Sequence, residues 1–215
     1  MLDREKQAVI ETAKELERLG LVRLGGGSVS VRADTGELIM TPACRSFNGL
    51  GTDGLLVMDS AGGTAVGVQP PDCAVALRYI YAHMPEVNAV IYTHQPYATA
   101  VGLAGEEFPA CCTTQCNVCL GSVSVAPCPT ADGEDMGVQA VRYIGDRRAV
   151  IIRQRGVIAV GPGLHEALAA CVYMEDAAKC YLAARSAASG KAALMTPEQE
   201  AEAVETFKDY GQKRT

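Results

Sequence analysis

Apolar residues recur at two spacings along the chain, and these spacings predict interspersed helices and strands. Over residues 3–20 they return every three or four positions, which is typical of an amphipathic helix. Similar patterns predict helices over residues 73–84, from Gln95 onward and, longest of all, over 166–187, while Thr196 and Gln199 form a capping box for a last helix. Short runs rich in Val, Ile and Leu predict strands at residues 28–32, 37–41, 55–59, 88–94, 122–126, 149–154 and 157–160.

These elements predict an α/β fold built as one domain over residues 1–215. The helices are placed among the strands without a strict strand–helix–strand alternation, so a mixed, mostly antiparallel sheet flanked by helices fits better than a parallel one. No linker rich in polar residues, Pro or Gly divides the chain, and 215 residues are enough to bury one sizeable core.

Charge and hydropathy narrow the range of partners. The formal net charge is −6 and no run of Lys or Arg is present, which argues against nucleic acid and anionic membranes. No stretch approaches about 20 uncharged apolar residues, and the first twenty positions mix charged with apolar side chains, unlike a signal peptide. We therefore expect a cytoplasmic protein whose partner is a small molecule, with no membrane contact.

The chain contains nine cysteines, four of them at Cys111, Cys112, Cys116 and Cys119. Without a secretion signal, these thiols are expected to stay reduced rather than form a disulfide framework. A metal site in the cluster would need a second pair of ligands, which Cys128 alone does not supply. Ordinary buried or loop thiols are the simpler interpretation.

A glycine-rich turn and a helix start are the first candidate sites. Residues 25–30 place three glycines before a strand, the reverse of a nucleotide-binding fingerprint, so they form either a plain tight turn or an anion-binding concavity. Asp72 and Cys73 follow a proline pair and open a helix. Asp72 suits a cap there, and the helix dipole lowers the pKa of a thiol at such a position, so Cys73 is either structural or a modest nucleophile.

Three histidines and two arginines complete the candidates. His83 and His165 lie near helix ends and have structural explanations, whereas His94 ends an apolar strand, where sites of α/β proteins form. Arg153 and Arg155 lie in the turn of a predicted strand pair. Such a turn is either a solvated tip or a place where a guanidinium holds a carboxylate or phosphate.

The order of several short motifs resembles the class II aldolase/adducin family, and the match spans almost the whole chain. The motifs are Gly20-Leu21, residues 27–32, Thr41-Pro42, Pro70, residues 84–90, Thr93-His94, and residues 108–110, 156–159 and 207–211. Each is weak alone, but together, in order and with natural spacing, they are specific. The family includes L-fuculose-phosphate aldolases and L-ribulose-phosphate 4-epimerases.

The resemblance implies a nine-stranded mixed sheet and a homotetramer with its active site between subunits. It also implies a divalent metal, commonly zinc, that three histidines hold and that polarises the substrate carbonyl. The matching ligand positions here are Tyr92, His94 and Arg155. The acid/base position is Cys73, with Asp72 before it, and Tyr210 matches a tyrosine that reaches a neighbouring subunit.

The chain departs from the family at this site. Only His94 remains of the three ligands, and Arg155 cannot ligate a metal because its guanidinium does not deprotonate. Asp72 occupies a phosphate-binding position, where its charge would repel a phosphate. The remaining substrate-binding positions are Gly27, Ser28, Thr41, Ala43 and Tyr92. The departures argue against the usual zinc and the usual sugar phosphate.

Three functions follow as hypotheses. The first is a lyase for aldol cleavage or related carbonyl chemistry on a small sugar-like or keto-acid substrate, with Arg155 stabilising the oxyanion, His94 or Cys73 moving protons and Tyr210 serving as acid. A variant of it keeps a metal through His94, Cys73 and Asp72. The second is a noncatalytic binding or assembly protein of the adducin type. The third and weakest is a thiol or metal sensor built on Cys111 to Cys119.

Overall fold

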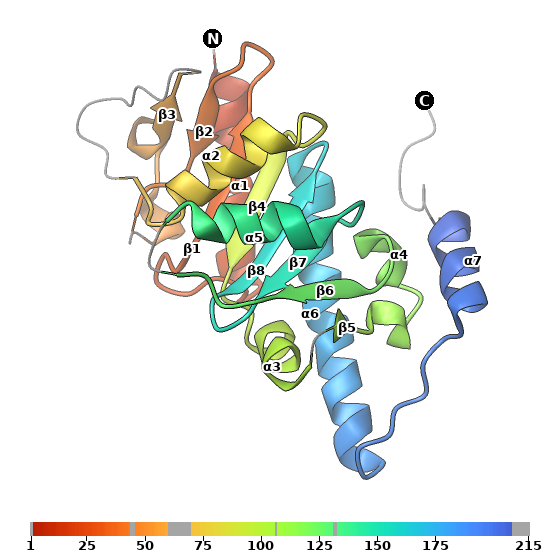
Figure 1. Cartoon of the computed structure of the whole chain (residues 1–215). Coiled ribbons are helices and arrows are strands. Elements are labelled where there is room, and N and C mark those ends of the chain that lie inside the picture. Colours follow the sequence, from red (N-terminus) through yellow and green to blue (C-terminus); the bar gives the residue numbers. More distant parts are fainter. Residues whose placement is uncertain (1, 44–45, 60–69, 106, 131–132, 208–215) are drawn as a thin grey trace.

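A computed structural model of the chain describes residues 2–43, 46–59, 70–105, 107–130 and 133–207 (Figure 1). Within these ranges the strands form one sheet in the order β3-β2-β1-β4-β8-β7-β6-β5. Their bounds are β1 (Gly27–Arg32), β2 (Leu38–Met40), β3 (Leu56–Met58), β4 (Ala89–Thr93), β5 (Glu107–Phe108), β6 (Val123–Ala126), β7 (Ala149–Ile152) and β8 (Gly156–Gly161).

Seven α-helices and three short 3-10 helices are found in the same described ranges. None of these helices is both long and apolar enough to cross a membrane. Their bounds are α1 (Asp3–Arg18), α2 (Ala74–His83), α3 (Pro96–Ala104), α4 (Cys116–Cys119), α5 (Asp135–Ile144), α6 (Leu164–Ala187) and α7 (Pro197–Phe207), with η1 (Phe47–Gly49), η2 (Thr52–Gly54) and η3 (Ala110–Cys112).

The sheet is mixed and mostly antiparallel, which confirms the fold expected from the sequence. Only β6 and β7 run parallel to each other, with Val125 opposite Ile151, and the other neighbouring strands of the described residues pair antiparallel. The sheet has eight strands in these residues, one fewer than the nine that the family resemblance implies.

Helices cover both faces of the sheet (Figure 1). Helices α2 and α5 pack on one face, against alternate strand residues such as Val90 and Ile158. Helices α1, α3 and α6 pack on the other, against the residues next to these, such as Ile91 and Ala159. Because β4 and β8 are buried on both faces, their sequences are continuous apolar runs rather than alternating ones.

The start of α7 follows from local sequence. Thr196 and Gln199 bond each other's backbone N–H groups at 3.3 and 2.9 Å, so the predicted capping box at the start of α7 is confirmed. One helix of the structure, α5, was not predicted from the sequence. Its Gly137 packs against α2 so closely that a Cβ there would lie 2.7 Å from the Ala76 carbonyl oxygen. The glycine therefore allows α2 and α5 to cross in contact.

Candidate active site

The candidate site lies at the edge of the sheet where β4 ends and β8 begins. Thr93 of β4 is opposite Val157 of β8, so the residues just beyond this pair, His94 and Arg155, meet at the same edge. The chain enters β8 through Gly156, whose φ is +127°. A Cβ at this position would lie 2.1 Å from the Thr93 carbonyl oxygen, so the close approach of the two strands requires glycine.

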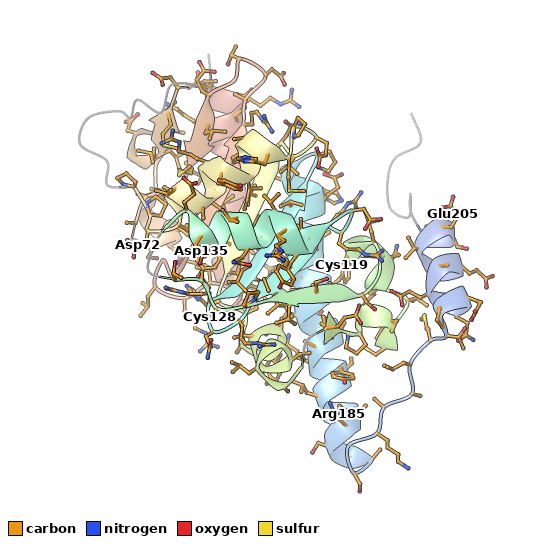
Figure 2. The ribbon with its side chains drawn as sticks, viewed as in Figure 1. Asp72, Cys119, Cys128, Asp135, Arg185 and Glu205 are labelled. Carbon is orange, nitrogen blue, oxygen red and sulfur yellow. The ribbon has the colours of Figure 1, made fainter. Side chains whose placement is uncertain are left out.

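A cavity of about 370 Å³ opens at this edge, next to the N-termini of α2 and α5. It brings together five residues that the sequence singled out for chemistry, from three separate parts of the chain. Figure 2 labels Asp72 just before α2 and Asp135 at the start of α5. The lining residues are Asp72, Cys73, Tyr92, His94, Pro129, Thr130, Gly133, Met136 and Arg155.

The two arginines of the β7–β8 turn point to different places. The Arg153 guanidinium donates to the carbonyl oxygens of Gly102 at 3.3 Å and Gly105 at 3.0 Å, and so ties the turn to α3. Arg155 is exposed and lines the cavity. The sequence left two interpretations of this turn, a solvated tip and a guanidinium that binds an anion. Because Arg155 lines the cavity, its guanidinium can bind an anion there.

Tyr92 links the two strand ends. Its hydroxyl donates to the Arg155 carbonyl oxygen at 2.9 Å, and its ring meets the His94 ring edge-on, with centroids 4.9 Å apart. Burial raises the pKa of Tyr92 above its ordinary range, and the neighbouring Cys73 adds to the rise, while the Arg155 charge opposes it. Tyr92 therefore stays a neutral phenol at physiological pH.

Cys73 is the N-cap of α2 and is 5% exposed. Burial raises the pKa of its thiol to about 12, which outweighs an opposing hydrogen bond with Ser28, and the Asp72 charge raises it further. The lowered pKa expected from the helix dipole is therefore wrong, because desolvation dominates. At neutral pH Cys73 is a thiol rather than a thiolate. Asp72, expected as the cap, precedes the N-cap position and faces solvent.

Four predicted substrate-binding residues do not line the cavity. Ser28 and Thr41 are fully buried behind Cys73, where the Thr41 hydroxyl donates to the Ser28 hydroxyl at 3.3 Å and accepts from the Val29 N–H at 3.2 Å. Gly27 packs so closely that a Cβ would lie 2.7 Å from the Tyr92 carbonyl oxygen. Ala43 is half-buried in the turn after β2. Of the predicted substrate-binding positions, Tyr92 is on the cavity wall.

One wall of the cavity was missed by sequence reasoning. It is formed by Pro129, Thr130, Gly133 and Met136, in the segment between β6 and α5. Asp135 fixes this wall by accepting from the Thr130 N–H at 2.7 Å, which lowers the pKa of its carboxyl group. One signal in the sequence could have indicated this wall. A loop that directly follows a strand lies at the edge of the sheet, where sites form.

The other predicted chemical groups lie elsewhere. Tyr210 falls outside the described residues, so no position is assigned to it. In the cysteine cluster, Cys119 and Cys112 donate to carbonyl oxygens of α6, at Ala170 and Ala177 respectively. His83 bonds the Tyr79 carbonyl oxygen at the end of α2, and His165 lies near the start of α6, as the sequence indicated.

The donors around the cavity do not fit the three-histidine metal site that the resemblance implies. His94 is the one imidazole on the wall, the Tyr92 hydroxyl is already a donor to the Arg155 carbonyl, and a guanidinium has no lone pair for a metal. Across the described ranges, no group of three or more His, Cys, Asp or Glu side chains is arranged to hold a metal ion.

Comparisons with known proteins agree with this architecture. A family model described as Class II Aldolase and Adducin N-terminal domain matches residues 7–182. The chain is 25% identical to 5-deoxy-D-ribulose 1-phosphate aldolase from Bacillus thuringiensis serovar kurstaki over 217 residues, which cover 99% of this chain and 100% of that protein.

Two solved structures have the same fold over nearly their whole length. An L-fuculose 1-phosphate aldolase superposes with a TM-score of 0.86 at 26% identity, covering 94% of this chain and 95% of its own. YgbL from Escherichia coli superposes with a TM-score of 0.83 at 18% identity, covering 94% of this chain and 98% of its own. The second likeness concerns the fold alone.

Proposed function

The chain belongs to the class II aldolase and adducin family, and from this premise we propose that it is a lyase that cleaves or forms a carbon–carbon bond next to a carbonyl group. The observation that carries the proposal is that Asp72, Cys73, His94 and Arg155 line one and the same cavity. It places a cation, an imidazole and a carboxylate around a space of about 370 Å³, enough for a small organic acid or sugar.

The chain's own residues supply the steps of an aldol cleavage. His94 supplies the imidazole of the cavity wall, and it accepts the proton of the substrate hydroxyl next to the carbon–carbon bond that breaks. The electron pair of that bond moves toward the carbonyl, giving an aldehyde and an enolate whose oxygen accepts hydrogen bonds from Arg155. The His94 imidazolium returns its proton to the enolate carbon. Cys73, which stays protonated, contributes a thiol donor rather than a nucleophile.

The charges of the cavity favour a substrate without phosphate. Arg155 provides one fixed positive charge, while the exposed carboxylate of Asp72 lines the same space. Asp72 would repel a phosphate dianion more strongly than a single negative charge. A keto acid can pair its one carboxylate with Arg155, and a sugar can donate its hydroxyl groups to Asp72. The relatives named as aldolases carry a phosphorylated sugar in their names, so this chain would differ from them in substrate.

The test is turnover on a panel of β-hydroxy carbonyl compounds, each offered with and without a phosphate group. Aldehyde release is measured with the purified full chain, before and after dialysis against a chelator, and its metal content is measured by elemental mass spectrometry. We expect cleavage of an unphosphorylated compound. Arg155→Ala should lower kcat/KM by about 10²–10³-fold, as loss of an oxyanion donor does. Arg155→Lys, which keeps the positive charge, should retain part of the activity that Arg155→Ala loses.

Three results would each overturn part of this proposal. Turnover that is unchanged in Arg155→Ala would remove the guanidinium from the mechanism. Near one metal ion per chain, with turnover lost on chelation, would replace the oxyanion role of Arg155 with a re-ligated metal. If the chain cleaves the phosphorylated form of a compound faster than the unphosphorylated form, Asp72 does not exclude phosphate.

A second candidate function, a noncatalytic binding protein, is favoured by one observation. Burial holds Cys73 and Tyr92 in their neutral forms, which leaves few groups on the cavity wall that can move a proton at neutral pH. This function predicts that carboxylates bind in calorimetry and that Arg155→Ala abolishes binding, while no compound of the panel is cleaved.

The proposal includes an assembly of several copies of the chain, because the family resemblance implies one. Of the homotetramer that the resemblance implies, we keep the expectation that a neighbouring chain borders the cavity and supplies Tyr210 to it. Light scattering of the purified chain measures the assembly. A strict monomer that cleaves substrate at full rate would contradict the expectation.

A further inference from the structure

Cys112 of η3 packs on α6, on the face of the sheet opposite α2 and α5, and α6 also carries Cys180. The Cys112 thiol donates to the Ala177 carbonyl oxygen of α6 at 3.5 Å. Cys180 lies three residues further along the same helix and is exposed, while Cys112 is half-buried. A side chain three or four residues beyond a helix carbonyl reaches that carbonyl, so the contact of Cys112 with Ala177 places its sulfur beside Cys180.

The electrostatics of the pair agree with this placement. Burial raises the pKa of Cys112 to about 11, and negative charge on Cys180 and then on Cys111 raises it further. The adjacent Cys111 thiol is directed elsewhere, toward Ser122 and the Glu200 carboxylate. Cys180 is thus the neighbour of Cys112 on α6, and it is the accessible member of the pair.

We infer that Cys112 and Cys180 form a thiol–disulfide exchange site that takes a low-molecular-weight disulfide of the glutathione type. The Cys180 thiolate attacks one sulfur of the small disulfide and displaces the other as a thiolate, giving a mixed disulfide at Cys180. Cys112 then loses its proton and attacks the Cys180 sulfur, displacing the second small thiol. Two protein thiols are oxidised to one internal disulfide, and the small disulfide is reduced to two thiols.

The internal bond would join two segments that are far apart in sequence. It would close a loop between residues 112 and 180 and fix η3 against α6. The neighbouring Cys111 carbonyl oxygen accepts from the Met195 N–H at 3.1 Å, on the segment that leads into α7. Cys112 therefore follows a residue that contacts the segment leading into α7. A disulfide here would be transient in a reducing compartment, as in proteins that sense redox state.

The experiment uses the full chain, reduced and then treated with oxidised glutathione, followed by peptide mapping under non-reducing conditions. All proteins carry Cys128→Ser, which removes the other exposed thiol of the described cysteines. We expect a linked peptide pair containing Cys112 and Cys180, with the chain lighter by two hydrogens and free of bound glutathione. The midpoint of thermal unfolding should rise by about 5–10 °C on oxidation, as expected when a disulfide closes a long loop.

Two further variants separate the steps. Cys112→Ser should trap glutathione on Cys180, because no resolving thiol remains, and Cys180→Ser should abolish both the adduct and the bond. Circular dichroism checks folding, and Cys112→Ala serves as a second replacement. A stable glutathione adduct on Cys180 with Cys112 intact, or a link from Cys180 to another cysteine, would overturn the inference. These readouts are masses rather than turnover, so they stand apart from the proposed lyase activity.

Discussion

The site edge of the sheet and the contact between α3 and α6 are held together in different ways. On the face of α2 and α5, the site edge depends on close backbone contacts that only glycine permits, at Gly27 and Gly156. Its polar side chains, Asp72, His94 and Arg155, are exposed to the cavity. Since these side chains do not hold the fold, they can be exchanged without losing it. The architecture of the sheet edge therefore does not depend on the identity of these three side chains.

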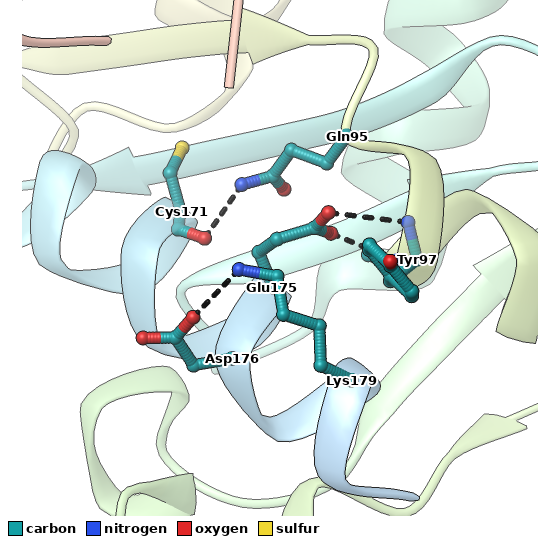
Figure 3. Close-up of polar contacts among 7 residues, drawn as sticks. Gln95, Tyr97, Cys171, Glu175, Asp176 and Lys179 are labelled. Carbon is teal, nitrogen blue, oxygen red and sulfur yellow. Dashed lines mark hydrogen bonds and ion pairs between the residues drawn. The ribbon is translucent and has the colours of Figure 1, made fainter. Parts of the chain in front are cut away.

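On the opposite face, buried polar side chains hold the helices in place (Figure 3). Glu175 of α6 is 2% exposed and accepts from the Tyr97 and Ala98 N–H groups at 3.2 and 3.0 Å, so it caps the first turn of α3. The Gln95 side chain donates to the Cys171 carbonyl oxygen at 2.6 Å. Here the polar groups are structural, and their replacement should be costly.

The largest expected effect comes from Gly156→Ala. The methyl group would meet the Thr93 carbonyl oxygen at 2.1 Å, and a φ of +127° is strained for alanine. We expect the free energy of unfolding to fall by about 4 kcal/mol, measured by urea denaturation, from overpacking and backbone strain together. Gly36→Ala is the matched control, because its φ is +98° with nothing within 4 Å of the added Cβ.

Gly36→Ala should lower the free energy of unfolding only through backbone strain, by about 1–2 kcal/mol. An equal loss in the two variants would show that the approach of β4 and β8 is not tight. In that case the contrast between a site edge held by backbone contacts and an α3–α6 contact held by side chains would fail.

Much of this arrangement could be predicted from the sequence. The apolar runs of β4 and β8 and the capping box of α7 are local signals, so the strands and that helix were found near their observed bounds. The order of short strands and interspersed helices indicated the mixed, mostly antiparallel sheet. Helix α5 was missed because Gly137 weakens its helical pattern, although Met136, Ala140 and Ile144 recur every four residues.

The cavity was less predictable than the fold. The positions of His94 and Arg155 followed from strand ends, but the wall at residues 129–136 consists of Pro, Thr, Gly and Met, which carry no chemical signal alone. Ser28 and Thr41 were expected at the substrate, yet both are buried. Burial also reversed the expected pKa shift of Cys73. Desolvation depends on packing between distant segments, which no local pattern reports.

The next largest effect is expected on the opposite face, from Glu175→Ala. This variant leaves two N–H groups of α3 without their carboxylate acceptor in a buried environment, so unfolding should become easier by about 3 kcal/mol. Asp176→Ala is the control on the adjacent residue, because Asp176 is half-exposed and pairs with Lys179 at 2.9 Å on the surface. The control should change stability by less than about 0.5 kcal/mol. Similar losses in both variants would remove the structural role of Glu175.

The smallest effect tests the cavity itself, through Tyr92→Phe. The variant keeps the ring and removes one hydrogen bond, the 2.9 Å bond to the Arg155 carbonyl oxygen. Because the turn is also held by the Arg153 bonds to α3, we expect a loss of only about 1 kcal/mol in urea denaturation. Tyr97→Phe, on a half-exposed ring, is the control and should leave stability unchanged. If Tyr92→Phe cost as much as Glu175→Ala, the cavity face would depend on its polar side chains too, and its donors could not change freely.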